Sequence, residues 1–449
     1  MLLGGVKASV LLFVGDIAIF ALALLLTLLI RYRGDLTPTI LHAHTGPFAI
    51  LFALWALIFY LSGLYGKRIV YLKANLANAL VRTQIVNIVL AALFFFLFPV
   101  GIAPKTNLVI YLVVSLALIL FWRLSLYPRL SRRALTAAAL LAEGKEAEEL
   151  VAEARANPRY GLDFRLVRPL SAIEPAVFER ELESLDVRLV IVDTSQEVSP
   201  ELSALIYKLT QLERRLQFAS FEDAYEEIFD RIPLSRLAHI WFLENVAPGT
   251  SALYALTKRL IDIAGGIVMG LIALVAIPLI FLADVLEDSG PLFIEQERFG
   301  QGGKLIRVYK FRTMEKNDGG AWAGENGNRV TPVVNFLRKT SLDEFPQFLN
   351  VLSGELSLIG PRNDIRALGD RLASALPYYE ARYLVKPGIT GWAQVNQQYE
   401  PGNASPQSVE ETKVRLAYDF YYLKHRSLGL DLVIALKTIK RMFFRVSSW

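Results

Sequence analysis

The chain has 449 residues, of which 53% are hydrophobic, and its net charge of +5 is small beside 48 basic and 43 acidic residues. This apolar content excludes an ordinary soluble enzyme, and the length predicts roughly two to four domains. The charge balance suits membrane loops and phosphate sites better than a nucleic-acid surface, so we expect no nucleic-acid partner. Cysteine is absent and the four histidines lack metal-binding spacing, so any metal would be a hard cation such as Mg²⁺ on oxygen ligands.

Four apolar runs fill the first third of the chain, and with its flanks each is long enough to cross about 30 Å of hydrocarbon. They are Ala8–Ile30, Phe48–Leu64, Ile85–Val100 and Leu108–Trp122. The first run is too long for a cleavable signal peptide, and no small-residue cleavage site follows it.

Basic residues flank these runs unequally. One side carries Lys7, Lys67, Arg68, Lys73, Arg82, Arg123, Arg129, Arg132 and Arg133, and the other carries Arg31, Arg33 and Lys105. The positive-inside rule therefore predicts that residues 1–133 form four transmembrane helices with both ends in the cytoplasm. Asp16 lies inside the first helix, where a carboxylate is unfavourable in lipid; it is either functional or a buried polar contact within the bundle.

Residues 134–240 have the pattern of a soluble α/β domain. The expected strands are Ala134–Leu141, Phe164–Val167 and Val187–Asp193, and the expected helices are Lys145–Ala156 and Glu201–Arg214. Strands that alternate with helices predict a parallel, doubly wound, Rossmann-like sheet. The turn after the first strand lacks the G-x-G-x-x-G loop that cradles a dinucleotide, so we predict a structural or regulatory domain.

A fifth apolar run, Ile263–Leu282, contains Pro278. Its length would let it span the membrane, which would put everything after Asp284 outside the cell. Alternatively, Pro278 removes a helical hydrogen bond and breaks the helix, so that it enters one leaflet and returns. The run alone leaves both alternatives open.

The chain then becomes polar and rich in charged motifs. Glu295–Gly303 is expected to be a turn-rich loop, and Ile306–Met314 an alternating strand that places Lys310 and Arg312 on one face. Two adjacent carboxylates, Asp343 and Glu344, follow among basic residues.

The segment Ser341–Glu344 has two interpretations. It is the sequence of a capping box, in which the serine caps a helix and the glutamate reaches back to it. Alternatively, the acidic pair has a chemical role, because a carboxylate forms acyl-phosphates as a nucleophile and a neighbouring carboxylate holds Mg²⁺ against a diphosphate. Basic side chains that would neutralise phosphoryl oxygens are Arg298, Lys310, Arg338 and Arg362.

From Lys258 to about Arg445 the chain contains seven motifs in order: Lys258-Arg-x-x-Asp262, Gln296-Glu-Arg-x-Gly300, Tyr309-Lys-Phe-Arg-Thr-Met314, Ser341-Leu-Asp-Glu-x-Pro-Gln347, Gly360-Pro-Arg362, Pro387-Gly-Ile-Thr-Gly-Trp-Ala-Gln-Val-Asn396 and Asp419-x-Tyr-Tyr422. In these motifs the segment resembles the catalytic domain of bacterial polyprenyl-phosphate sugar-1-phosphate transferases, the monotopic phosphoglycosyl transferase superfamily. The whole chain resembles the large members, which start exopolysaccharide, O-antigen or capsule repeat units. The resemblance implies a multi-pass protein of the bacterial inner membrane, with a catalytic domain over residues 241–449 and a re-entrant helix at about 258–284.

The resemblance also implies a reaction. Asp343 would attack the β-phosphate of a UDP-sugar, UMP would leave, and undecaprenyl phosphate would take the phosphosugar from the aspartate, while Glu344 helps to bind Mg²⁺. Arg338 and Arg362 match phosphate-site positions. Lys310, Arg312, Arg298, Pro361 and Gln394 are further expected substrate-binding residues.

Two residues depart from the family pattern. The usual Ser-Pro at the helix break is Ile277-Pro278, and the usual Gly-Pro-Arg-Pro ends in Asn363.

The amphipathic segment Leu430–Phe444 is expected to lie on an anionic lipid surface. The Rossmann-like domain is a candidate for homodimer formation.

Two other function classes fit parts of the chain. Membrane-bound nucleotide-sugar dehydratases need a glycine-rich cofactor loop, which is missing, and a Tyr-x-x-x-Lys pair, whose spacing Tyr254 and Lys258 share. A membrane scaffold that binds nucleotide sugars would give the acidic pair no chemical role. Replacement of Asp343 distinguishes the scaffold from the transferase.

Overall fold

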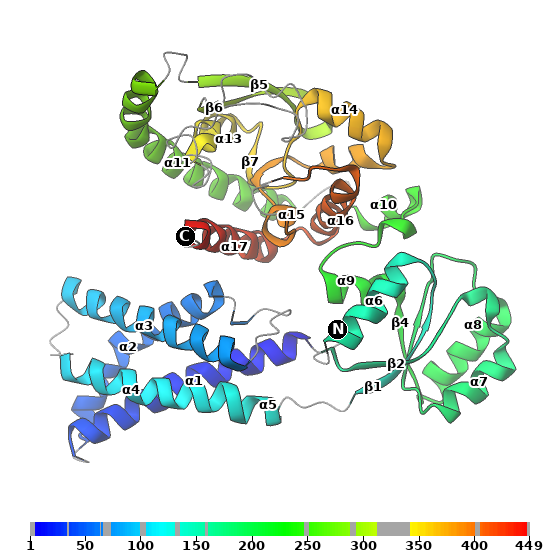
Figure 1. Cartoon of the computed structure of the whole chain (residues 1–449), viewed down its shortest axis with the longest axis horizontal. Helices are drawn as coiled ribbons and strands as arrows, with labels where there is room; N and C mark the ends of the chain where they lie inside the picture. Colours follow the sequence, from blue (N-terminus) through cyan, green and yellow to red (C-terminus); the bar gives the residue numbers. More distant parts are fainter. Residues whose placement is uncertain are drawn as a thin grey trace. The chain divides into compact units, whose positions relative to one another are not determined.

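The computed structural model describes residues 5–33, 36–62, 64–65, 73–98, 105–130, 135–157, 160–246, 251–287, 293–311, 342–399 and 405–446. The chain divides into two compact units, Met1–Ala224 and Tyr225–Trp449 (Figure 1). The domain limits 133/134 and 240/241 drawn from the sequence stay predictions.

The first unit begins with long apolar helices. They are α1 (Gly5–Arg31), α2 (Pro38–Leu61), α3 (Lys73–Leu97) and α4 (Lys105–Phe121), and α4 continues through a π-helical turn, Trp122–Leu126, into α5 (Tyr127–Leu130). Within the described residues, four helical spans of this unit and one of the second are long and apolar enough to cross a membrane. Aromatic side chains such as Phe20, Phe48 and Trp55 fill the core between these helices. The N-terminal region is therefore helical and suited to a membrane, as predicted.

Asp16 is a buried polar contact inside this helical region. Its carboxylate accepts a hydrogen bond from Arg123 Nε at 3.0 Å and one from the Tyr65 hydroxyl at 2.7 Å. The same arginine donates to the Leu64 carbonyl at 2.8 Å. A buried charge needs such partners, so the geometry agrees with the second of the two alternatives for Asp16.

A parallel sheet follows, in the strand order β2-β1-β3-β4. Its elements are β1 (Thr136–Leu141), α6 (Lys145–Ala156), β2 (Leu162–Arg168), α7 (Pro175–Ser184), β3 (Leu189–Val192), α8 (Pro200–Tyr207) and β4 (Gln217–Ser220). The parallel sheet is confirmed. The last predicted helix is shorter than expected: α8 passes into a π-helical turn, Lys208–Leu212.

Helix α9 (Phe221–Phe229) lies across the division between the units, and α10 (His239–Asn245) and α11 (Ala252–Glu287) follow. The other elements are β5 (Phe293–Phe299), β6 (Leu305–Phe311), the 3₁₀-helix Leu342–Gln347, α13 (Phe348–Ser353), β7 (Ser357–Ile359), α14 (Arg366–Ala375), the 3₁₀-helix Tyr379–Leu384, β8 (Gly388–Thr390), α15 (Trp392–Asn396), α16 (Val409–His425) and α17 (Leu428–Val446). β5 pairs antiparallel with β6, and β7 pairs parallel with β8. The loop predicted at Glu295–Gly303 is wrong in its first half, because residues 295–299 complete β5.

Helix α11 is continuous over 36 residues with Pro278 inside it, and its ribbon bends along its length in Figure 1. Its glycines allow close packing: a Cβ on Gly265 would lie 2.3 Å from Leu358, and one on Gly270 would lie 2.9 Å from Phe348. Other residues of this helix expose apolar side chains, such as Leu274 and Val275 at 66% and 73%. A re-entrant path through lipid stays a prediction.

The motif Lys258-Arg-x-x-Asp262 connects α11 to the rest of the second unit through polar contacts. Lys258 pairs with Asp431 of α17 at 2.9 Å. Arg259 donates to the carbonyls of Val351 and Leu352, both at 2.6 Å. In a separate contact, Asp262 accepts hydrogen bonds from the Ser357 hydroxyl at 3.0 Å and the Leu358 backbone N–H at 2.9 Å.

Residues 226–241 pack against later elements of the second unit. The Ile232 backbone N–H donates to the Ala417 carbonyl at 3.1 Å, and Trp392 Nε1 donates to the Asp230 carbonyl at 2.8 Å. The Trp241 side chain lies in the same hydrophobic core. Glu226 also pairs with Lys424 at 2.7 Å.

Candidate active site

Residues predicted from the sequence meet around Glu344. The acidic pair lies in the first turn of the 3₁₀-helix Leu342–Gln347. Lys310 of β6 lies 3.2 Å from Glu344 Oε1, and Arg362, in the loop after β7, donates to both oxygens of that carboxylate. Arg312 and Arg338 lie outside the described residues, as does Ser341, so the capping-box interpretation cannot be compared with the structure.

The charges around Glu344 alter its protonation. Burial alone would raise the pKa of Glu344, but Arg362 and Lys310 together lower it well below its usual value. Burial, together with the like charges of Arg298 and Arg362, lowers the pKa of Lys310 to about 8, against the attraction of Glu344. Glu344 therefore stays ionised at neutral pH, between cations that outnumber it.

Asp343 lies beside this cluster and is half-buried. Its carboxylate acts electrostatically on Lys310 and on Arg362 and raises the pKa of the arginine, though less than Glu344 does. The two carboxylates therefore differ in burial: Glu344 is buried, whereas Asp343 is half-buried. A partly exposed carboxylate beside fixed positive charge is suited to attack on an anionic phosphorus centre.

The loop that carries Arg362 is held by tightly packed backbone. The Gly360 N–H donates to the Thr390 carbonyl at 2.9 Å, and the Gly388 N–H donates to the Pro361 carbonyl at 3.0 Å. A Cβ on Gly388 would lie 2.1 Å from the Gly360 nitrogen. Pro361 is thus a buried loop residue whose observed contact is with β8.

Arg298 and Gln394 make structural contacts near the cluster. Arg298 Nη1 donates to the backbone and side-chain oxygens of Asn363, at 3.0 and 3.2 Å, and its Nη2 donates to Gln296 at 2.9 Å. Gln394 Nε2, in α15, donates to the carbonyl of Ile389 in β8 at 3.0 Å. The substrate roles expected of both residues stay predictions.

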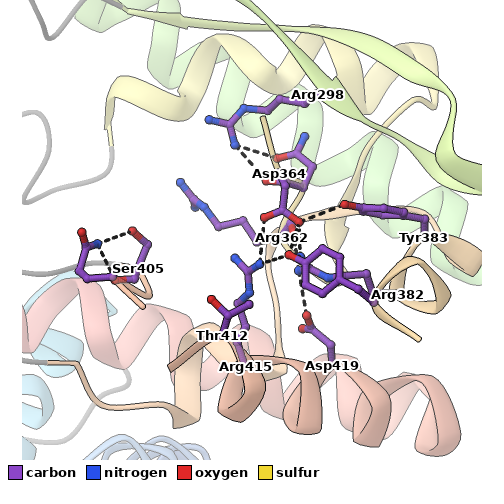
Figure 2. A network of polar contacts seen from close by, with 12 residues as sticks. Arg298, Arg362, Asp364, Arg382, Tyr383, Ser405, Thr412, Arg415 and Asp419 are labelled. Carbon is purple, nitrogen blue, oxygen red and sulfur yellow. Dashed lines mark hydrogen bonds and ion pairs between the residues drawn. The ribbon is translucent and has the colours of Figure 1, made fainter. Parts of the chain in front are cut away.

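A second buried network lies behind Arg362 (Figure 2). Asp364 accepts hydrogen bonds from the hydroxyls of Tyr379 and Tyr383, at 2.7 and 3.2 Å, and pairs with two arginines, Arg382 and Arg415. Burial alone would raise the pKa of Asp364, and the two arginines lower it well below its usual value.

Most residues of this network were not predicted from the sequence. Asp419 lies in a recognised motif, and Asp364 follows Arg362 by two residues, which is a weak signal for a linked role. Arg382 and Arg415 stand in no motif, and only the tertiary structure brings them to Asp364.

The carboxylates present fit Mg²⁺ in part. Asp343 and Glu344 offer oxygen ligands, and Mg²⁺ is often held by one or two carboxylates together with substrate phosphates. Among the described residues, no three His, Cys, Asp or Glu side chains form a metal-binding group. A cation here would depend on phosphate oxygens for its remaining ligands, and it would share Glu344 with Lys310 and Arg362.

Tyr254 and Lys258, the spacing match to a dehydratase pair, both contact Asp431. The tyrosine hydroxyl lies 3.1 Å from this carboxylate and the lysine 2.9 Å. They join α11 to α17, so the structure gives them a packing role.

Comparison with known proteins gives one consistent group. Residues 253–445 match the family model described as bacterial sugar transferase. The chain is 41% identical over 200 residues to the UDP-N-acetylgalactosamine-undecaprenyl-phosphate N-acetylgalactosaminephosphotransferase of Aeromonas hydrophila, a match that covers 42% of this chain and 44% of the relative. It is 38% identical over 187 residues to a UDP-glucose:undecaprenyl-phosphate glucose-1-phosphate transferase of Caulobacter vibrioides. This match covers 41% of this chain and 68% of the relative.

A shorter relative is matched almost completely. The chain is 33% identical over 189 residues to the exopolysaccharide production protein PSS of Rhizobium leguminosarum, and the match covers 40% of this chain and 92% of the relative. By contrast, the chain spans less than half the length of the Aeromonas relative, 44%.

Proposed function

The chain belongs to the bacterial sugar transferase family, and on that premise we propose that it transfers a sugar-1-phosphate from a UDP-sugar to undecaprenyl phosphate. The products are undecaprenyl-diphospho-sugar and UMP. The names of the Aeromonas and Caulobacter relatives specify undecaprenyl phosphate and different sugars, so the proposal leaves the sugar open. It places the reaction at the first membrane step of exopolysaccharide, O-antigen, capsule or glycoconjugate assembly.

The reaction proceeds in two displacements. An oxygen of Asp343 forms a bond to the β-phosphorus of the UDP-sugar, and the bond from that phosphorus to the bridging oxygen breaks, so that UMP leaves with the electron pair. A phosphate oxygen of undecaprenyl phosphate then attacks the same phosphorus and releases the Asp343 carboxylate. The acidic residue is thus regenerated without an added reductant or oxidant.

One observation supports this assignment above the others. Glu344, the neighbour of Asp343, is bound by Lys310 and Arg362, so positive charge lies beside a half-buried carboxylate. That charge would stabilise the phosphoryl oxygens as the nucleophile approaches. A scaffold that only binds nucleotide sugars would give Asp343 no role in this arrangement.

Mg²⁺ is the expected cofactor, with Glu344 as its protein ligand. When bound, it would neutralise charge on the diphosphate. The residues of the chain would then orient the donor through Arg362 and Lys310 and keep Asp343 ionised.

The proposal includes a membrane topology. Four transmembrane helices over residues 1–133, a Rossmann-like domain and a re-entrant α11 would keep the catalytic domain at the cytoplasmic face of the bacterial inner membrane. Nucleotide sugars and undecaprenyl phosphate would meet there. The exposed apolar side chains of α11 and the amphipathic α17 would contact lipid.

The test uses purified full-length protein with undecaprenyl phosphate, Mg²⁺ and a panel of UDP-sugars, with UMP release as the signal. We expect UMP with at least one sugar and, when the lipid is omitted, a hexose-phosphate adduct on the peptide that contains residue 343. Asp343→Asn should abolish both signals, whereas Asp370→Asn, an exposed aspartate of α14, should change neither. Turnover by Asp343→Asn would overturn the covalent mechanism, and no UMP release across a broad panel would overturn the transferase assignment.

A further inference from the structure

The backbone behind the Arg362 side chain is held at three consecutive carbonyls. Arg382 Nη2 donates to the carbonyl of Arg362 at 2.7 Å, and Arg298 Nη1 donates to the carbonyl of Asn363 at 3.0 Å. The backbone N–H of Phe299 donates to the carbonyl of Asp364 at 3.0 Å. Three donors from two separate parts of the chain therefore fix the backbone from which the Arg362 side chain extends.

Of these donors, Arg382 is the most enclosed. Its side chain is completely buried, at 0% exposure, and pairs with Asp364 and with Asp419, the latter at 2.8 Å. Burial alone would lower the pKa of Arg382, but the two carboxylates raise it well above its usual value. Figure 2 shows Arg382, Asp364 and Asp419 grouped beside Arg362.

Asp364 is in turn held by further groups. Besides Arg382, it receives hydrogen bonds from Tyr379 at 2.7 Å and Arg415 at 3.0 Å. A buried carboxylate with this many donors has little freedom to rotate, and it fixes the guanidinium beside it.

The two ends of Arg362 face different partners. Its guanidinium binds Glu344 beside the candidate nucleophile, whereas its carbonyl binds Arg382. Arg382 therefore reaches the candidate site through the backbone of another residue.

We propose that Arg382, held by Asp364 and Asp419, is a positioning residue that sets the direction of the Arg362 guanidinium toward the diphosphate of the nucleotide sugar. This inference rests on the proposed function. A displacement of about 1 Å in a group that orients substrate lowers turnover by about 100-fold. The network thus couples a buried ion cluster to the geometry of phosphoryl transfer.

A double-mutant cycle separates this role from simple stabilisation of the core. Arg382→Lys keeps the charge but loses the fork that joins Asp364, Asp419 and the Arg362 carbonyl. We expect it to lower kcat by about 100-fold in the wild-type background. In an Arg362→Lys background, which lacks the guanidinium that Arg382 positions, we expect it to lower kcat by less than about threefold. Equal losses in both backgrounds would overturn the proposal.

A matched control measures the effect of an unrelated buried ion pair. Glu226→Gln weakens the contacts of Glu226 with Lys424 and His425, both at 2.7 Å, in the same compact unit. It should lower the melting temperature and leave kcat unchanged at a temperature where the protein is folded. A similar loss of kcat in this variant would mean that any weakening of the unit impairs turnover, which contradicts a specific role for Arg382.

A milder variant serves if Arg382→Lys fails to fold. Tyr379→Phe keeps the buried ring and removes the hydroxyl that contacts Asp364 and Arg382; kcat should fall by about tenfold, again only with Arg362 present. The result is distinguishable from failure of the proposed function. Wild-type protein without UMP release would refute both, whereas an active wild type, an inactive Asp343→Asn and equal effects in the two Arg362 backgrounds would refute only the positioning role.

Discussion

Arg362 binds the carboxylate of Glu344 through both terminal nitrogens of its guanidinium, and Nη1 lies 3.2 Å from Oε2. Lys310 reaches the same carboxylate at 3.2 Å. The β5–β6 hairpin, the 3₁₀-helix of the acidic pair and the loop after β7 therefore meet at one side chain. Five predictions follow from this and from the packing of the same unit.

Glu344→Gln should impair both folding stability and turnover. The change leaves Lys310 and Arg362 buried beside a neutral group, and removal of one partner from a buried ion pair costs about 3 kcal/mol. We expect a lower melting temperature and a loss of UMP release. Glu295→Gln is the control, because its pair with Arg307 at 3.1 Å is exposed and contributes about 0–1 kcal/mol. Equal melting temperatures for Glu344→Gln and wild type would contradict the prediction.

The pH dependence should contain an alkaline limb from Lys310. Burial lowers the pKa of this lysine to about 8, so its positive charge is present below that pH and is lost as the pH rises through it. If Lys310 neutralises phosphoryl oxygens, kcat/KM for the nucleotide sugar should fall above about pH 8. Lys310→Arg should remove this limb, since arginine stays charged, whereas Lys304→Arg in the turn of the same hairpin should retain it.

The lowered pKa of Lys310 should also make the stability of the protein depend on pH. The unfolded chain holds the Lys310 proton up to about pH 10, while the folded chain releases it near pH 8. Between these values the unfolded state binds more protons, so the contribution of Lys310 to stability rises with pH. A melting temperature whose pH dependence over this window is identical in wild type and Lys310→Arg would argue against the shift.

Gly388→Ala should disrupt the Arg362 loop. A Cβ there would lie 2.1 Å from the Gly360 nitrogen, so backbone rather than a flexible side chain would have to move. Overpacking of this kind costs about 1–3 kcal/mol, and we expect lower stability and little UMP release. Gly429→Ala is the control, because the nearest atom to its Cβ is 4.0 Å away. An active, stable Gly388→Ala protein would show that the loop adapts.

Asp262→Ala should loosen the attachment of α11. It leaves the Leu358 backbone N–H and the Ser357 hydroxyl without their acceptor, and a buried unsatisfied donor costs about 1–3 kcal/mol. The melting temperature should fall, whereas Asp370→Ala, at an exposed position of α14, should leave it unchanged. If the two variants have the same melting temperature, Asp262 does not contribute to this attachment.

The sequence predicted the elements that have strong local patterns. β1 is a run of buried residues, and α6 has an amphipathic pattern that begins and ends where expected. β4 was missed because it has four residues, two of them exposed, and gives no apolar run. The end of the helix predicted at Glu201–Arg214 was also misplaced, because the π-helical turn Lys208–Leu212 keeps the side-chain pattern of an α-helix.

The candidate site shows the same division between local and distant information. The acidic pair and Arg362 stand in short motifs, and their meeting was expected. The partners of Asp364 could not be predicted, because Arg382 and Arg415 come from distant segments and only tertiary packing selects them. For Arg298, the motif indicated a phosphate ligand, whereas the contacts observed are to Gln296 and Asn363.

The packing of residues 230–241 bears on how a truncated protein should be designed. A recombinant fragment that starts at residue 253, where the family match begins, would discard Ile232 and Trp241 and uncover the apolar surface that they shield. It would also leave the indole of Trp392 without its acceptor on Asp230. A fragment that starts before Tyr225 keeps these pieces, so the smallest portion of the chain worth expressing is longer than the region that relatives have in common.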